Sequence, residues 1–271
     1  MSYDLVEMLV LRRRQQQWKE RMNFEPPCLP ESTGTGPALQ VYLLGSVSFE
    51  AALNLQRRMA YQVSGDPESA AMILCEHLPL ITVGREGSRN HILCEPEDLI
   101  ARRWPVRWVN RGGGCLLHLP GQLAIYPIVD LEKLGLDLQG YLDRLHTVLR
   151  AVVRDFIGTA ETRHGRTGVW ANSRPIAGVG VAVCNGVTYH GAFLNVNADL
   201  QPFRRVLFGD RGDGPMTSLE RERRGRVSPT LVRQSLLEHF TDRFHFGRTS
   251  LFFDHPLLGR KAPSDAVPAS S

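Results

Sequence analysis

A glycine cluster between two apolar runs constrains this chain more than any other feature. Three glycines at 112–114 lie between Arg111 and His118, and apolar runs of strand length flank the stretch at 106–109 and 123–129. Because glycine lacks a Cβ, its backbone can adopt positive φ angles and approach a ligand closely. The pattern predicts a strand, a tight loop and a second strand, with the loop closed over something flat or extended. A plain hairpin turn is the alternative interpretation.

The length of 271 residues is enough for one large core with tails. We expect an N-terminal extension and linker over 1–38, a single domain over 39–250, and a disordered Pro/Ser/Ala-rich tail over 251–271. Within the extension, residues 5–22 have the spacing of an exposed amphipathic helix with a basic cluster.

The composition narrows the class of protein. An apolar content of 42% and a charged content of 22% are ordinary for a globular chain, and no apolar run approaches the ~20 residues of a membrane helix. The basic cluster follows the first apolar stretch, which is the wrong order for a secretory signal, so we expect a cytoplasmic protein with no membrane partner. A net charge of +4 suits an acidic protein partner and does not indicate nucleic acid.

The five cysteines are dispersed, with no Cys-x-x-Cys pair and no compact Cys/His cluster. They are Cys28, Cys75, Cys94, Cys115 and Cys184. An odd, scattered set indicates reduced thiols and neither a disulfide framework nor a structural zinc site. We therefore expect no metal and no cofactor.

Strand-like and helix-like segments mix without regular alternation, which favours an α+β fold with a mixed central β-sheet flanked by helices. The Asn185-Gly186 pair between two apolar runs is a strong hairpin signal. The expected strands are 39–44, 72–74, 80–84, 106–109, 123–129, 176–183 and 187–196, and the expected helices start near Ser46 or Ser48, at 96–102, 138–157 and 229–240.

The ordered motif Arg111-Gly-Gly…His118-x-Pro-Gly-Gln-Leu is much more specific than a glycine run. It resembles the signature loop of the lipoyl/octanoyl transferases (lipoate-protein ligase B type), in the biotin/lipoate protein ligase superfamily. The likeness covers about residues 39–243. Further segments similar to the family lie at 82–85, 168–170, 176–180, 187–200 and 217–219.

This resemblance implies the biotin/lipoate transferase-ligase fold and the transfer of an octanoyl group from acyl carrier protein to a lysine of a lipoyl domain. Such domains belong to 2-oxoacid dehydrogenases or the glycine cleavage H protein. The substrate-binding residues that it implies are Arg111, Gly112, Gly113, Gly114, Cys115, Leu116, Leu117, His118, Gly178, Val179, Gly180, Gly191, Ala192 and Phe193. Leu116 and Leu117 replace a more polar and aromatic pair, which makes the rim more apolar and leaves the acyl length open.

The reaction in this family uses a cysteine thiol whose pKa a nearby lysine lowers. Following the resemblance, Gly209 stands at the position of the cysteine and Pro175 at that of the lysine. Neither residue can substitute for the missing group, so the standard mechanism is not expected to operate here.

Three hypotheses follow. The nucleophile could be relocated to Cys115, with Arg111 and His118 supplying positive charge or a base, although a small apolar loop residue is the favoured interpretation of Cys115. An ATP-dependent ligase is disfavoured, because Pro175 removes its lysine too. Alternatively, the chain is an inactive relative that binds acyl carrier protein or a lipoyl domain through the arginine-rich stretch 204–226.

Overall fold

The computed structural model describes residues 36–66, 69–163, 165–166, 168–208 and 214–259. The predicted helix at 5–22 and Cys28 lie outside these residues. Within them, a seven-stranded mixed sheet has the order β10-β1-β2-β6-β9-β8-β7, and a three-stranded sheet has the order β4-β3-β5. The predicted α+β fold, a mixed sheet flanked by helices, is confirmed.

The strands of the large sheet are β1 (Ala38–Ser46), β2 (Ser69–Glu76), β6 (Gln122–Ile128), β7 (Gly168–Ala171), β8 (Arg174–Cys184), β9 (Val187–Asn195) and β10 (Arg248–Phe252). The small sheet consists of β3 (Leu80–Val83), β4 (Val106–Trp108) and β5 (Cys115–His118). The helices are α2 (Phe49–Gly65), α3 (Pro96–Arg102), α4 (Leu138–Ile157), α5 (Leu219–Arg223), α6 (Pro229–Phe244) and α7 (Pro256–Gly259), with short 3-10 turns at Arg89–His91 and Pro202–Arg205.

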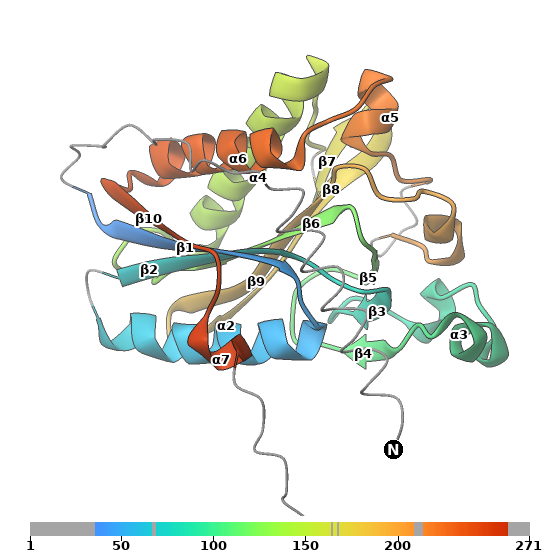
Figure 1. Cartoon of the computed structure of the whole chain (residues 1–271), viewed down its shortest axis with the longest axis horizontal. Helices are drawn as coiled ribbons and strands as arrows, with labels where there is room; N and C mark the ends of the chain where they lie inside the picture. The colour runs from blue at the N-terminus through green and yellow to red at the C-terminus, as the bar shows by residue number, and fades with distance from the viewer. Residues whose placement is uncertain (1–35, 67–68, 164, 167, 209–213, 260–271) are drawn as a thin grey trace, which may run out of the picture.

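Helices cover both faces of the large sheet: α4 and α6 lie on one face and α2 on the other (Figure 1). The α2 helix begins where Ser48 accepts a hydrogen bond from the Ala51 amide, at 3.2 Å, as an N-cap residue does. Its buried side chains include Leu55, Met59 and Val63, which recur at helical spacing and pack on the sheet. The first turn of α2 is thereby fixed at the end of β1.

The small sheet lies beside one end of the large one, near α3 (Figure 1). Here the sequence prediction of a single tight loop between 106–109 and 123–129 was wrong. Within that span β5 pairs antiparallel with β3, while β4 pairs parallel with β3, so β4 and β6 belong to different sheets. The reason is that Leu116 and Leu117 are apolar and buried, and a strand satisfies their backbone groups.

One sequence signal, the hairpin at Asn185-Gly186, is confirmed in detail, whereas the C-terminal boundary differs from the expectation. Asn185 and Gly186 both have positive φ, 49° and 79°, and they connect β8 to β9 as a two-residue hairpin. At the C-terminal side, β10 continues to Phe252 and pairs parallel with β1, with Tyr42 opposite Phe252. The described elements therefore run past residue 250, where the tail was expected to begin.

Candidate functional site

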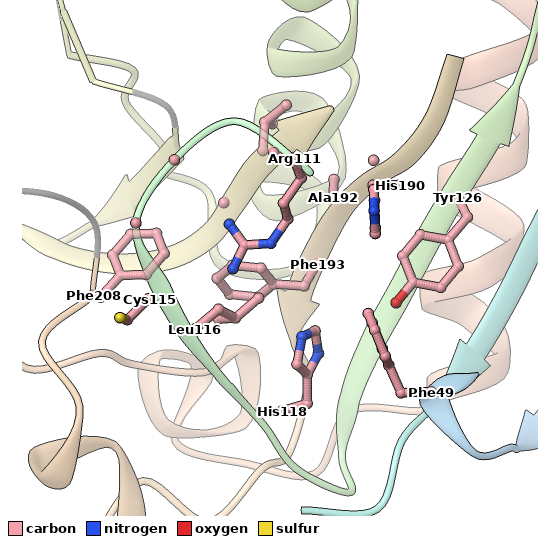
Figure 2. Close-up of a pocket in the computed structure, with 16 residues that line it drawn as sticks. Phe49, Arg111, Cys115, Leu116, His118, Tyr126, His190, Ala192, Phe193 and Phe208 are labelled. Carbon is pink, nitrogen blue, oxygen red and sulfur yellow. The ribbon is translucent and has the colours of Figure 1, made fainter. Parts of the chain in front are cut away.

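A cavity lies where the glycine loop meets the large sheet (Figure 2). About 510 Å³ of empty space lies within it and at its mouth, part of it open to solvent. Its walls come from the glycine loop, β5, β6, β8, β9, the first residue of α2 and Phe208. The lining residues are Phe49, Arg111, Gly113, Gly114, Cys115, Leu116, His118, Tyr126, Gly178, Val179, Gly180, His190, Gly191, Ala192, Phe193 and Phe208.

The cavity has an open side and a closed end. Gly113 and Gly180 and the ring of Phe208 are half-buried, which places the opening beside the glycine loop. At the other end, Phe49 and Tyr126 are almost fully buried, with exposed fractions of 5% and 4%. A ligand that enters beside the loop therefore ends against this aromatic floor.

Two glycines of β8 allow the walls to approach closely. A Cβ at Gly178 would lie 2.6 Å from the Phe193 ring and 2.7 Å from the Phe208 ring. One at Gly180 would lie 2.7 Å from the Gly112 carbonyl oxygen. Phe193 and Phe208 meet edge to face, with ring centroids 5.6 Å apart. The absence of a Cβ at Gly178 thus leaves room for the two aromatic rings, and its absence at Gly180 leaves room for the glycine loop.

Arg111 is the cation at the cavity. It is 8% exposed, and its guanidinium donates hydrogen bonds to the Gly112 carbonyl at 3.0 Å and to the carbonyl and hydroxyl oxygens of Thr82 at 3.1 and 2.8 Å. Burial lowers its pKa to about 10, so Arg111 stays charged at neutral pH. The side chain is held rigidly by these three bonds.

The histidines at the closed end are neutral. Burial, together with Arg111 and Arg57 nearby, lowers the pKa of His190 to about 3. Burial also lowers the pKa of His118 well below its ordinary value, and the neighbouring His77 and Arg111 lower it further. The hypothesis that His118 supplies a base at neutral pH is therefore disfavoured, because so low a pKa makes a weak proton acceptor.

Cys115 is the cavity's thiol. Its Sγ donates to the Ser88 carbonyl oxygen at 3.3 Å, the residue is 1% exposed, and burial raises the pKa of the thiol despite the charges of Arg111 and Arg89. A thiol with a raised pKa holds little of the reactive thiolate. The geometry thus favours the interpretation that Cys115 serves as a small apolar residue in the cavity wall.

The position that the resemblance assigns to the family lysine is structural in this chain. Pro175 is buried in β8 opposite Trp170, and its carbonyl oxygen accepts a hydrogen bond from the Thr217 amide at 2.8 Å. Within the part of the chain that the structure describes, Lys133 is the lone lysine, and its Nζ bonds to the carbonyl oxygens of Val63 and Asp66 at 2.8 and 2.9 Å. Gly209 lies outside the described residues.

Most of the substrate-binding residues predicted from the sequence line the cavity. Gly112 and Leu117 are the exceptions: the Gly112 amide is bonded to the Val181 carbonyl at 3.0 Å, and Leu117 is buried on β5 in an apolar cluster. The sequence prediction did not include four lining residues, namely Phe49, Tyr126, His190 and Phe208. His190 lies in the segment 187–200 that resembles the family, and Tyr126 closely follows the Arg111 motif, so the sequence held signals for both, whereas Phe49 is brought in by the packing of α2.

A family model, described as the lipoyl protein ligase A/B catalytic domain, matches residues 48–241. The chain belongs to this family. An octanoyltransferase of Geotalea uraniireducens is 38% identical over 204 residues, which cover 74% of this chain and 92% of that protein. An octanoyltransferase of Acidobacterium capsulatum is 32% identical over 243 residues, covering 85% and 96%.

Solved structures of lipoate-protein ligases share the fold of this family. A lipoate-protein ligase A bound with ATP matches with a TM-score of 0.64 at 17% identity, over 81% of this chain and 90% of that one. A bi-partite lipoate protein ligase from Thermoplasma acidophilum matches with a TM-score of 0.57 at 16% identity, over 81% and 86%. At these identities the likeness concerns the fold alone.

The described residues contain neither a membrane-spanning helix nor a cluster of metal ligands. No helix among them is long and apolar enough to span a membrane. No group of three or more His, Cys, Asp or Glu side chains in the same residues is arranged to hold a metal ion.

Proposed function

We propose that this chain transfers an octanoyl group from acyl carrier protein to a lysine of a lipoyl domain. The observation that carries the proposal is the cavity: an apolar wall formed by glycines and aromatic rings, closed at Phe49 and Tyr126, with the Arg111 charge beside it. Such a shape suits an unbranched acyl chain inserted tail first. The relatives named octanoyltransferases support the same reaction.

The transfer step that we propose is direct. The acceptor lysine amine attacks the thioester carbonyl, a C–N bond forms, the C–S bond breaks, and the carrier thiol leaves with the proton that the amine loses. No thiol–lysine pair lies at the cavity among the described residues, which is why we favour this route over an acyl-enzyme. Arg111 would favour the negative charge that develops on the carbonyl oxygen, because its buried charge is already in place.

The experiment mixes the protein with octanoyl-acyl carrier protein and an apo lipoyl domain, and weighs all three by intact mass spectrometry. We expect the lipoyl domain to gain one octanoyl group and the carrier to lose it, with no mass change on this chain. Omitting the protein is the first control. A Lys-to-Arg lipoyl domain is the second, since it removes the acceptor amine. An unmodified lipoyl domain in the presence of active carrier would contradict the proposal.

A second candidate is a relative that binds a carrier without turnover. Most of the described arginines between positions 204 and 226 are exposed, namely Arg204, Arg221, Arg223, Arg224 and Arg226. Carrier proteins are acidic, so this surface would steer them electrostatically. On this alternative, octanoyl-carrier protein binds with an affinity that falls as salt rises, and the lipoyl domain stays unmodified. Binding that does not respond to salt would remove it.

A further inference from the structure

A line of buried polar side chains runs behind the cavity wall, from the glycine loop towards α5. Arg111 donates to the Thr82 hydroxyl at 2.8 Å, and the Thr82 hydroxyl lies 3.1 Å from Nε2 of His118. Further along, the Gln122 amide donates to Asn195 at 3.0 Å, and Asn195 donates to the Thr217 carbonyl at 3.0 Å. These residues come from four separate segments of the chain.

The hydrogen bonds decide which nitrogen of His118 carries the proton. The Thr82 oxygen already accepts from Arg111, so its own proton is available for Nε2 of His118. Nδ1 makes no direct hydrogen bond in either assignment, but the opposite assignment would also leave the Thr82 proton without an acceptor, so it has one more unpaired buried group. The proton of neutral His118 therefore belongs on Nδ1.

Gln122 is another polar neighbour of the His118 ring. Its amide nitrogen donates to Asn195 and to the Leu117 carbonyl, at 3.0 and 3.3 Å. Nδ1 of His118 is buried and makes no direct hydrogen bond in the described structure, and Nε2 faces the buried Thr82 hydroxyl. Both nitrogens thus lie in the wall rather than at the accessible surface of the cavity.

We propose that Thr82 is a positioning residue that holds His118 in the Nδ1–H form, with both ring nitrogens in the cavity wall. His118 then presents only ring carbon atoms to an acyl tail, and the cavity selects an unsubstituted hydrocarbon tail. This inference rests on the proposed function, since it names the kind of acyl tail that the same cavity takes. Thr82 itself touches no substrate; it acts through the imidazole, which lies between Arg111 and Phe49 in Figure 2.

The first test needs no substrate. Protein labelled with ¹⁵N-histidine reports by NMR which ring nitrogen is protonated, and a His118→Gln variant assigns the signals. We expect protonated Nδ1 in the wild type and in Thr82→Ser, which keeps the hydroxyl. Thr82→Val has the same shape without the hydroxyl, and we expect mixed protonation there. Circular dichroism and the urea midpoint check that both variants fold.

The second test compares octanoyl-pantetheine with 8-hydroxyoctanoyl-pantetheine by calorimetry. We expect the wild type and Thr82→Ser to favour the plain chain about 10- to 100-fold. Thr82→Val should lose most of that preference, because an imidazole that Thr82 no longer holds can turn a ring nitrogen towards the hydroxyl. Protonated Nε2 in the wild type, or Thr82→Val with unchanged protonation and preference, would overturn the inference. A wild-type preference for the hydroxylated chain, as His190 could supply, would overturn it as well. If neither compound binds, the proposed function fails together with the tail selection, while the NMR result still decides the role of Thr82.

Discussion

Adding one methyl group at Gly178 should close the cavity from the side. The Cβ of Gly178→Ala would lie 2.6 Å from the Phe193 ring and 2.7 Å from the Phe208 ring. Carbon atoms in contact are normally about 3.5–4.0 Å apart, so a ring must move by about 1 Å. Phe193 is packed in the core, whereas Phe208 is half-buried, and we therefore expect Phe208 to move.

The size of the effect follows from overpacking. Extra methyl groups in a packed site typically cost about 1–3 kcal/mol. If the displaced ring takes space from the ligand, this cost appears in binding, and affinity for octanoyl-pantetheine falls roughly 5- to 150-fold. If the cost appears in the empty protein instead, the free energy of unfolding falls by about the same 1–3 kcal/mol. Calorimetry and urea denaturation together distinguish the two.

Two controls make this prediction specific. Gly225→Ala adds the same methyl group where nothing lies within 4 Å, so binding and stability should stay unchanged. Phe208→Ala removes the ring, and the double variant Gly178→Ala/Phe208→Ala should recover part of the loss, with a coupling energy of about 0.5–3 kcal/mol. Wild-type affinity and stability in Gly178→Ala, or strictly additive effects in the double variant, would refute the packing argument.

Three further predictions concern charge and reactivity. Cys115→Ala should leave octanoyl transfer within about twofold of wild type, and intact mass should show no octanoyl group on wild-type Cys115; a thioester there would restore the relocated-nucleophile hypothesis. Burial lowers the pKa of His77 to about 4, so the native state resists protonation and the free energy of unfolding should fall as pH drops from about 6.5 to 4, with a slope near 1.4 kcal/mol per pH unit for this one proton. His77→Gln should reduce the slope of the urea-denaturation profile in that range by about this amount, while His118 and His190 keep their own contributions, and an unchanged slope would contradict the assignment. Burial raises the pKa of Glu222, but hydrogen bonds from Thr217, Asn172 and Arg174 outweigh burial and lower the pKa. The contribution of Glu222 to stability is therefore present above the ordinary carboxyl pKa and is lost as pH falls through the lower folded value. Glu222→Gln should be less stable than wild type at pH 7 and approach wild-type stability in acid, which thermal melts at both pH values would check.

The sequence predicted those parts of the fold that depend on local patterns. The Ser48 cap, the helices at 96–102 and 138–157, and the Asn185-Gly186 hairpin each follow from residues that are neighbours in the chain. The separate three-stranded sheet could not be predicted this way. Its existence depends on β3, β4 and β5 pairing with one another rather than with the large sheet, which is a long-range choice that no local pattern records.

The candidate site likewise contains residues that a local sequence pattern could predict and residues that it could not. Gly178 and Gly180 were predicted from a motif, and the structure shows the close approach of Phe208 and of the glycine loop that explains them. Phe208 could not be identified, because an isolated aromatic residue in a loop is not distinctive. The neutral state of His118 was likewise hidden, since it depends on burial and on His77, which is 41 positions away.

The central claim is that this cavity delivers an octanoyl group directly to a lipoyl-domain lysine. The most direct measurement is a time course of intact masses for this chain, octanoyl-acyl carrier protein and apo lipoyl domain in one mixture. The account predicts that octanoyl leaves the carrier and appears on the lipoyl domain at matching rates, while the mass of this chain never changes. A transient octanoyl adduct on this chain, or a lipoyl domain that gains nothing beyond the protein-free control, would contradict it.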